Sequence, residues 1–90
     1  RRAMPRLLDL AREHEIVSVL VSDAQAVQGC SRFADTTRLL VEPACGASIA
    51  ALGAHPDVFE RFKAPLIEVC GGMGVSLARL AQWRTDFGLA

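Results

Sequence analysis

A cysteine followed by two glycines lies near the carboxyl-terminal end of this chain, in the stretch VCGGMGVS at residues 69–76. The thiol of Cys70 is a weak hydrogen-bonding group that a protein can present to a ligand. The alternative role is that of a small buried core residue, which is the commoner fate of a single cysteine. The elements that surround Cys70 decide between these two roles.

The residues on either side of Cys70 predict a strand, a glycine turn and a helix. The apolar run PLIEVC leads into the cysteine, and the amphipathic run SLARLAQWRTDFG follows the glycines. Open α/β sheets bind their ligands at the carboxyl ends of strands, where such a turn lies. This setting can present a thiol to a ligand, but by itself it leaves the buried core role open as well.

The rest of the chain alternates between helical and strand-like patterns. Helices are predicted over 5–14, 23–37, 44–55, 57–62 and 76–88, and strands over 16–21, 38–43 and 64–70. Ser22 or Asp23 can cap the second helix, while Ser76 and Gly88 mark the two ends of the last one. Alternation of this kind predicts an α/β fold, a three-layer doubly wound parallel sheet of which these residues form a part.

Composition predicts that the chain is one piece of a larger folded body. Apolar residues make up 51% of its 90 residues, whereas a domain of this size buries only about 60% of its unfolded surface. Mean hydropathy is +0.27. The opening stretch RRAMPRLL has an internal methionine and no apolar signal region, which also indicates a segment of a longer polypeptide.

Charge and cysteine spacing exclude several classes of partner. Ten basic and ten acidic residues are interspersed and give zero formal net charge, so we expect no nucleic-acid surface. No apolar run reaches the roughly 18 residues that a bilayer span needs, so we expect no membrane partner. Cys30, Cys45 and Cys70 lack metal-type spacing, which predicts no metal site, no disulfide scaffold and reduced thiols of a cytoplasmic protein.

Two stretches resemble one enzyme family. LVEPACGASIAAL at 40–52 and IEVCGGMGVSLARLAQW at 67–83 are similar to the carboxyl-terminal part of the L-serine/L-threonine dehydratases, and EIVSVLVSDAQAV at 15–27 is similar as well. Those enzymes use pyridoxal 5'-phosphate and have the tryptophan-synthase-β fold, called fold type II. The resemblance implies that residues 1–90 are the carboxyl-terminal part of the cofactor-binding catalytic domain. It also implies an amino-acid substrate and a homodimeric complete protein.

The resemblance gives Cys70 a role. In that family a serine, threonine or cysteine at the end of a strand faces the pyridine nitrogen of the cofactor, just before a pair of glycines that Gly71 and Gly72 match. A neutral thiol does not hold the ring nitrogen protonated as a carboxylate would. That weaker electron withdrawal suits β-elimination of serine or threonine to ammonia and pyruvate or 2-oxobutyrate. We assign Gly71 and Gly72 to close approach of the backbone beside the ring, because GGMG alone is a weak phosphate-binding signal.

No catalytic residue is assigned within the chain. Lys63 is its one lysine, and it precedes the predicted strand that ends at Cys70, so we expect it at the opposite end of the sheet from the cofactor. The resemblance places the Schiff-base lysine and the phosphate loop upstream of Arg1, and the chain alone is then inactive. Met73 departs from the family pattern, which commonly has a polar residue after the glycines.

Several other polar or aromatic residues are given structural roles. Glu42 is predicted to be a polar group at a strand end rather than a general acid, and Cys45 to be packed rather than reactive. Gly46 is expected to let a helix and a strand approach closely. His14 and His55 are expected to face solvent. Trp83 is expected to pack in the core or against another subunit.

Two other functional classes fit the sequence. One is another enzyme of fold type II, a threonine synthase or a β-replacement synthase, although serine or threonine is commoner at the Cys70 position there. The other is a non-catalytic α/β interaction module with an apolar face for a partner. The sequence leaves the preference for serine or threonine open, since the substrate side of the pocket lies outside these residues.

Overall fold

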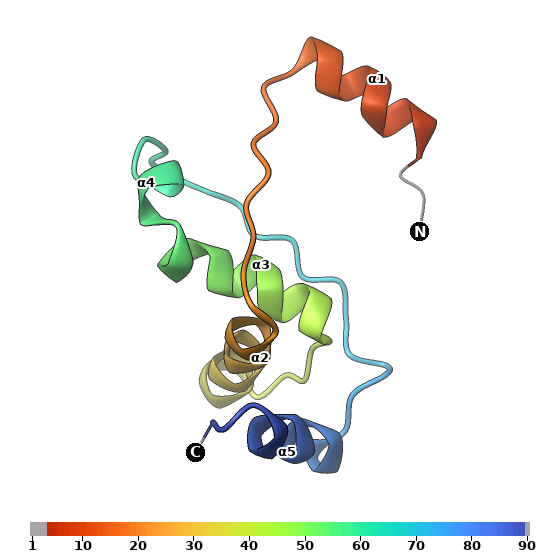
Figure 1. Ribbon diagram of the computed structural model, residues 1–90, viewed down its shortest axis with the longest axis vertical. Coiled ribbons are helices and arrows are strands. Elements are labelled where there is room, and N and C mark those ends of the chain that lie inside the picture. Colours follow the sequence, from red (N-terminus) through yellow and green to blue (C-terminus); the bar gives the residue numbers. More distant parts are fainter. Residues whose placement is uncertain (1–3, 90) are drawn as a thin grey trace.

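Helices form all the regular secondary structure in residues 4–89, the part of the chain that this computed structural model describes (Figure 1). Residues 1–3, which belong to the opening stretch RRAMPRLL, and residue 90 lie outside the described residues. In chain order the helices are α1 (Pro5–Glu13), α2 (Asp23–Thr37), α3 (Pro43–Ala54), α4 (Pro56–Phe59) and α5 (Leu77–Asp86).

The helix boundaries follow the capping signals of the sequence. Ser22 caps α2, because its hydroxyl accepts a hydrogen bond from the Gln25 amide at 3.1 Å while the Gln25 side chain accepts from the Ser22 amide at 2.8 Å. Ser76 caps α5 in the same way, with its hydroxyl 3.1 Å from the Arg79 amide nitrogen. Gly88 takes a φ of 68° just beyond α5. These predictions are confirmed.

The predicted parallel sheet is wrong for the described residues. Segments 16–21, 38–43 and 64–70, which were expected to be strands, contain no β-ladder. An extended segment becomes a strand only when a second backbone runs beside it at about 4.8 Å over several residues. Here the hydrogen bond nearest to such a pairing runs from the Glu42 amide to the carbonyl oxygen of Gly71, one residue beyond the last segment, at 3.0 Å. The apolar, β-branched pattern therefore marks extended backbone and not a doubly wound α/β fold.

The core forms where α2 crosses α3, with α5 packed against α2 (Figure 1). Gly29 of α2 and Gly46 of α3 touch at the crossing, since a Cβ built on Gly29 would lie 2.3 Å from the Gly46 carbonyl oxygen. Gly46 therefore lets two helices approach closely. The prediction that it would let a helix and a strand approach is wrong. Five buried side chains make the core cluster, with Trp83 packed against them as predicted: Val27, Cys30, Val41, Cys45 and Leu80.

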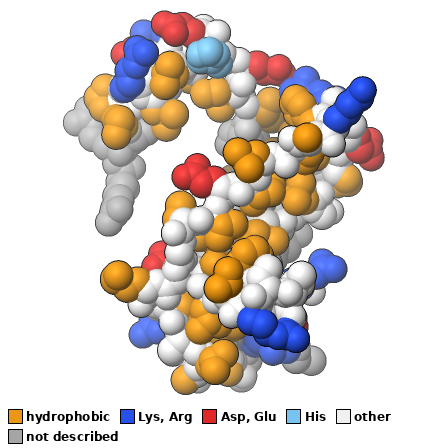
Figure 2. All heavy atoms as spheres, turned by 180° about the vertical axis from the view of Figure 1, so that it is seen from behind, with side chains coloured by type: hydrophobic (Ala, Val, Ile, Leu, Met, Phe, Trp, Pro, Cys, Tyr) orange, Lys and Arg blue, Asp and Glu red, His pale blue; other side chains and the backbone are white. Residues whose placement is uncertain are grey.

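Large hydrophobic side chains remain on the surface. Leu20, Leu66 and Met73 are 84%, 94% and 101% exposed, and Figure 2 shows hydrophobic side chains gathered over the middle of one face. Helix α1 contacts none of the other helices, and it buries no residue. None of the described helices has the length and apolar character that a membrane crossing requires.

Candidate functional site

The loop of residues 70–74 docks on the amino-terminal end of α3, and Glu42 holds it at two points. The Glu42 amide donates to the Gly71 carbonyl oxygen at 3.0 Å. The Glu42 carboxylate accepts a hydrogen bond from the Gly74 amide at 3.2 Å. Pro43 occupies the first turn of α3, where its fixed φ favours the helix and its missing N–H costs nothing. Glu42 lies at the end of an extended segment, and its two hydrogen bonds hold the loop in place. Its role is therefore structural, as a clamp on the loop.

Removing the Glu42 carboxylate is expected to loosen this loop. Glu42→Ala leaves the Gly74 amide without its acceptor, and a hydrogen bond to a charged group contributes about 1.5–3 kcal/mol. Glu42→Gln is the matched control, because its amide oxygen can still accept that hydrogen bond. We expect hydrogen–deuterium exchange at Gly74 to speed by roughly tenfold in the alanine variant, and by less in the glutamine variant. Equal exchange in all three proteins would contradict the clamp.

Two thiols meet beneath the loop. The Cys70 amide donates to the Cys45 sulfur at 3.2 Å, and the Cys45 thiol lies 3.8 Å from the Gly71 carbonyl oxygen, a weak contact. Cys45 is buried in the third position of α3, whereas Cys70 is exposed. Hydrogen bonding from the Gly71 backbone lowers the pKa of the Cys45 thiol. The neighbouring Cys45 charge, followed by Glu68, raises the pKa of Cys70. Cys70 is thus kept as a neutral thiol.

The glycines of the loop differ in their surroundings. A Cβ on Gly72 would lie 2.0 Å from the Leu40 carbonyl oxygen, so this position requires glycine for close approach to the backbone. A Cβ on Gly71 would meet nothing within 4 Å. Among the described residues only Arg38 and Gly88 have positive φ, so none of the three loop glycines serves a left-handed turn. Gly71, which follows Cys70 in the chain, therefore borders open space.

The remaining candidate residues lie elsewhere. Segment 66–68 lies beside the middle of α3, and Lys63 precedes it on the side of α4. Cys70 instead contacts the amino-terminal end of α3, a helix about 18 Å long at 1.5 Å per residue. His14 is exposed. His55 is half-buried, and its ring hydrogen-bonds the Leu20 carbonyl oxygen rather than facing solvent alone.

All three cysteines gather around the start of α3, which their sequence spacing did not indicate. A Cβ on Gly46 would lie 2.6 Å from the Cys30 sulfur, and burial raises the pKa of the Cys30 thiol. No group of three or more histidine, cysteine or acidic side chains within residues 4–89 is arranged to hold a metal ion. One sequence feature could have indicated that Cys45 and Cys70 lie close together. Each cysteine comes at or just after the end of an apolar extended segment.

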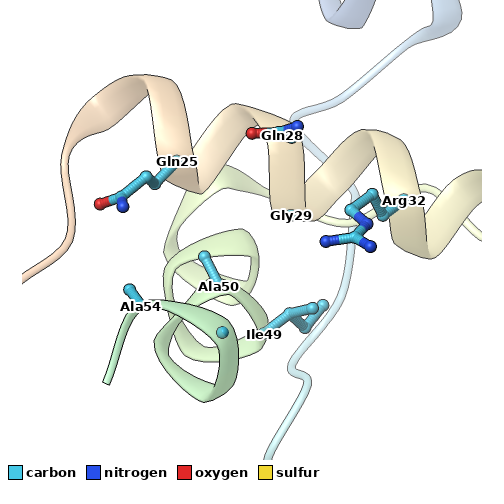
Figure 3. A pocket seen from close by; sticks show the side chains of 8 residues that line it. Gln25, Gln28, Gly29, Arg32, Ile49, Ala50 and Ala54 are labelled. Atoms are coloured by element: carbon cyan, nitrogen blue, oxygen red, sulfur yellow. The ribbon is translucent and has the colours of Figure 1, made fainter. Parts of the chain in front are cut away.

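A pocket of about 300 Å³ lies between α2 and α3, away from the 70–74 loop (Figure 3). Gly29, Ala50 and Ala54 open it because their small side chains leave space at the crossing. Its lining has one charged side chain, Arg32, and no thiol, carboxylate or imidazole. For a reaction that needs a proton donor or a nucleophile, the 70–74 loop is therefore the better candidate site than this pocket.

Comparison with known proteins finds relatives among the serine dehydratases. The L-serine dehydratase/L-threonine deaminase of Homo sapiens is 38% identical over 90 residues, which cover 91% of this chain. The protein of the same name from Bos taurus is 39% identical over 87% of the chain, and a serine dehydratase-like protein of Mus musculus is 36% identical over 92%. The chain is homologous to the L-serine dehydratases. This confirms the resemblance seen in VEPACGA and CGG.

The match covers only part of those relatives. The chain spans 27% of the length of the human protein, 26% of the bovine one and 28% of the murine one, which is about a quarter of the curated relatives it matches. No protein-family model matches the chain.

Proposed function

We propose that this chain is the carboxyl-terminal part of the catalytic domain of a pyridoxal-phosphate-dependent L-serine/L-threonine ammonia-lyase. The reaction is β-elimination, which gives ammonia and pyruvate or 2-oxobutyrate. The observation that carries the proposal is the exposed Cys70 thiol, set beside open space at Gly71 on a loop that Glu42 clamps. Homology to serine dehydratases over 91% of the chain supports it.

The residues of the loop fit one edge of a planar cofactor ring. Pyridoxal phosphate, when bound, supplies the electron sink that stabilises negative charge at the substrate carbon. Cys70 would face the pyridine nitrogen, and its raised thiol pKa keeps it neutral, so it leaves that nitrogen unprotonated. Gly71 adds no side chain that would obstruct the ring. The described residues contribute the nitrogen side of the site, and Lys63 lies away from it.

The surroundings of the proposed enzyme follow from the same features. Its substrate is a small amino acid, and we propose a homodimer for the complete protein. All the described cysteines are free, which fits a reducing cytoplasm.

Replacing Cys70 in the complete protein tests this function. Cys70→Ala is expected to retain the bound cofactor, measured by its visible absorbance, and to lower turnover of L-serine by roughly tenfold, which corresponds to the loss of about 1.4 kcal/mol of interaction. Met73→Ala is the matched control, because Met73 is exposed on the same loop. Unchanged turnover in Cys70→Ala would remove Cys70 from the site.

The products of the same assay separate the alternatives. A threonine synthase or a β-replacement synthase would release no ammonia from L-serine alone. An interaction module would neither bind pyridoxal phosphate nor turn over L-serine, and its exposed apolar side chains would instead serve a protein partner.

A further inference from the structure

The Cys45 sulfur lies against the backbone of Cys70. A disulfide needs Cβ atoms about 3.5–4.5 Å apart. The Cys45 sulfur already lies 3.2 Å from the Cys70 amide nitrogen, an atom two bonds from the Cys70 Cβ. Rotation about the Cα–Cβ bond of Cys70 can therefore bring the sulfurs together without unfolding the helix.

The two thiols differ in ways that suit stepwise exchange. Cys70 is exposed, so a small dissolved disulfide can reach its sulfur, whereas Cys45 is buried and shielded from such a reagent. Cys45 also lies at a helix amino terminus and accepts a backbone hydrogen bond, and both features favour its thiolate. The exposed thiol is thus suited to be modified first, and the buried thiolate to displace the modifying group.

We propose that Cys45 and Cys70 are a reversible modification site, at which thiol–disulfide exchange with oxidised glutathione forms an intramolecular disulfide. Cys70 first loses its proton to solvent, and the thiolate formed attacks one sulfur of oxidised glutathione, which releases one glutathione thiolate and leaves a mixed disulfide on Cys70. The Cys45 thiolate then attacks the Cys70 sulfur, which forms the protein disulfide and releases the second glutathione. Two protein thiols are oxidised, and one molecule of oxidised glutathione is reduced to two thiols.

The disulfide changes what the loop can bind. Its formation consumes the Cys70 thiol and ties its sulfur to Cys45 of α3. This consequence rests on the proposed function, since the thiol withdrawn is the one proposed to face the cofactor. The cross-link itself depends only on the geometry of the two cysteines.

Trypsin separates the three cysteines, which makes the cross-link directly measurable. Cleavage after arginine and lysine places Cys30 on residues 13–32, Cys45 on 39–61 and Cys70 on 64–79. The folded complete protein is incubated in glutathione buffers of increasing oxidised fraction, free thiols are trapped with N-ethylmaleimide, and the digest is analysed by mass spectrometry. We expect peptides 39–61 and 64–79 to be joined, and reduced glutathione to separate them again.

Three serine variants locate the two steps. In Cys45→Ser, glutathione is expected to stay on peptide 64–79, because no thiolate displaces it. In Cys70→Ser, peptide 39–61 is expected to remain unmodified until the protein is denatured. Cys30→Ser is the matched control and is expected to give the same cross-link as the unchanged protein. Persistent glutathione on peptide 64–79 of the unchanged protein, no modification at all, or a cross-link to peptide 13–32 would overturn the proposal.

Repeating the incubation with pyridoxal phosphate bound separates this inference from the proposed function. We expect the cofactor to slow the cross-link by at least fivefold, because it covers Cys70. If the proposed function is wrong, the cross-link still forms, at the same rate with and without pyridoxal phosphate. If the thiol pair is wrong, the cofactor binds and no cross-link appears in either case.

Discussion

Replacing Gly46 with alanine is expected to lower the free energy of unfolding by about 3 kcal/mol, the upper part of the range for overpacked cores. The added methyl group would lie 2.0 Å from the Ala26 carbonyl oxygen and 2.6 Å from the Cys30 sulfur. Neither neighbour can yield by itself, because the carbonyl belongs to the backbone of α2 and the sulfur is buried. The two helices must therefore separate, and the buried contacts between them weaken.

A glycine elsewhere in the same helix gives the control for this change. Gly53 also lies in α3, but a Cβ there would meet nothing within 4 Å. Gly53→Ala is expected to raise the free energy of unfolding by about 0.5–1 kcal/mol, through helix propensity. Urea denaturation of the complete protein, followed by circular dichroism, measures both changes. Equal effects of the two substitutions would show that the crossing of α2 and α3 is not tightly packed.

Gly72→Ala is expected to undock the 70–74 loop. The new methyl group would lie 2.0 Å from the Leu40 carbonyl oxygen, which is backbone and cannot rotate away. Displacing the loop breaks the hydrogen bond between the Glu42 amide and the Gly71 carbonyl oxygen, and it removes the Cys70 amide from the Cys45 sulfur. We expect a cost of about 2 kcal/mol.

Alkylation of Cys45 measures this displacement. Its thiol is buried in the docked structure, so iodoacetamide reaches it only when the loop opens. A cost of about 2 kcal/mol corresponds to roughly thirtyfold faster labelling. Gly71→Ala is the matched control, because a Cβ there meets nothing within 4 Å, and its labelling rate should stay near that of the unchanged protein. Unchanged labelling in Gly72→Ala would contradict the close approach to Leu40.

The helices were predictable because their signals are local. Ser22 with Gln25, and Ser76 with Arg79, satisfy amide groups three residues away, so the sequence alone contains both partners. The sheet was not predictable in this way. Strand pairing depends on which backbone lies alongside, and the patterns around Val19, Val41 and Val69 cannot specify that neighbour.

The candidate site was predictable in part. Cys70 stood out through its glycines and through the family resemblance, and its exposure agrees with a thiol that is presented to a ligand. Its partner Cys45 lies 25 residues earlier in the chain, and only the docking of the loop on α3 brings the two together. Gly46 was assigned a close approach from its residue type, but the element it approaches is fixed by the crossing with Gly29.

The separation of α1 from the other helices has a consequence for cooperativity. The radius of gyration is 14.6 Å, whereas about 12 Å is expected for a compact domain of this length. The difference reflects a nine-residue arm that buries nothing against α2, α3 or α5. A helix shorter than about 12 residues is marginal by itself in water. Within the described residues α1 is therefore not part of the cooperative unit, which α2, α3 and α5 form.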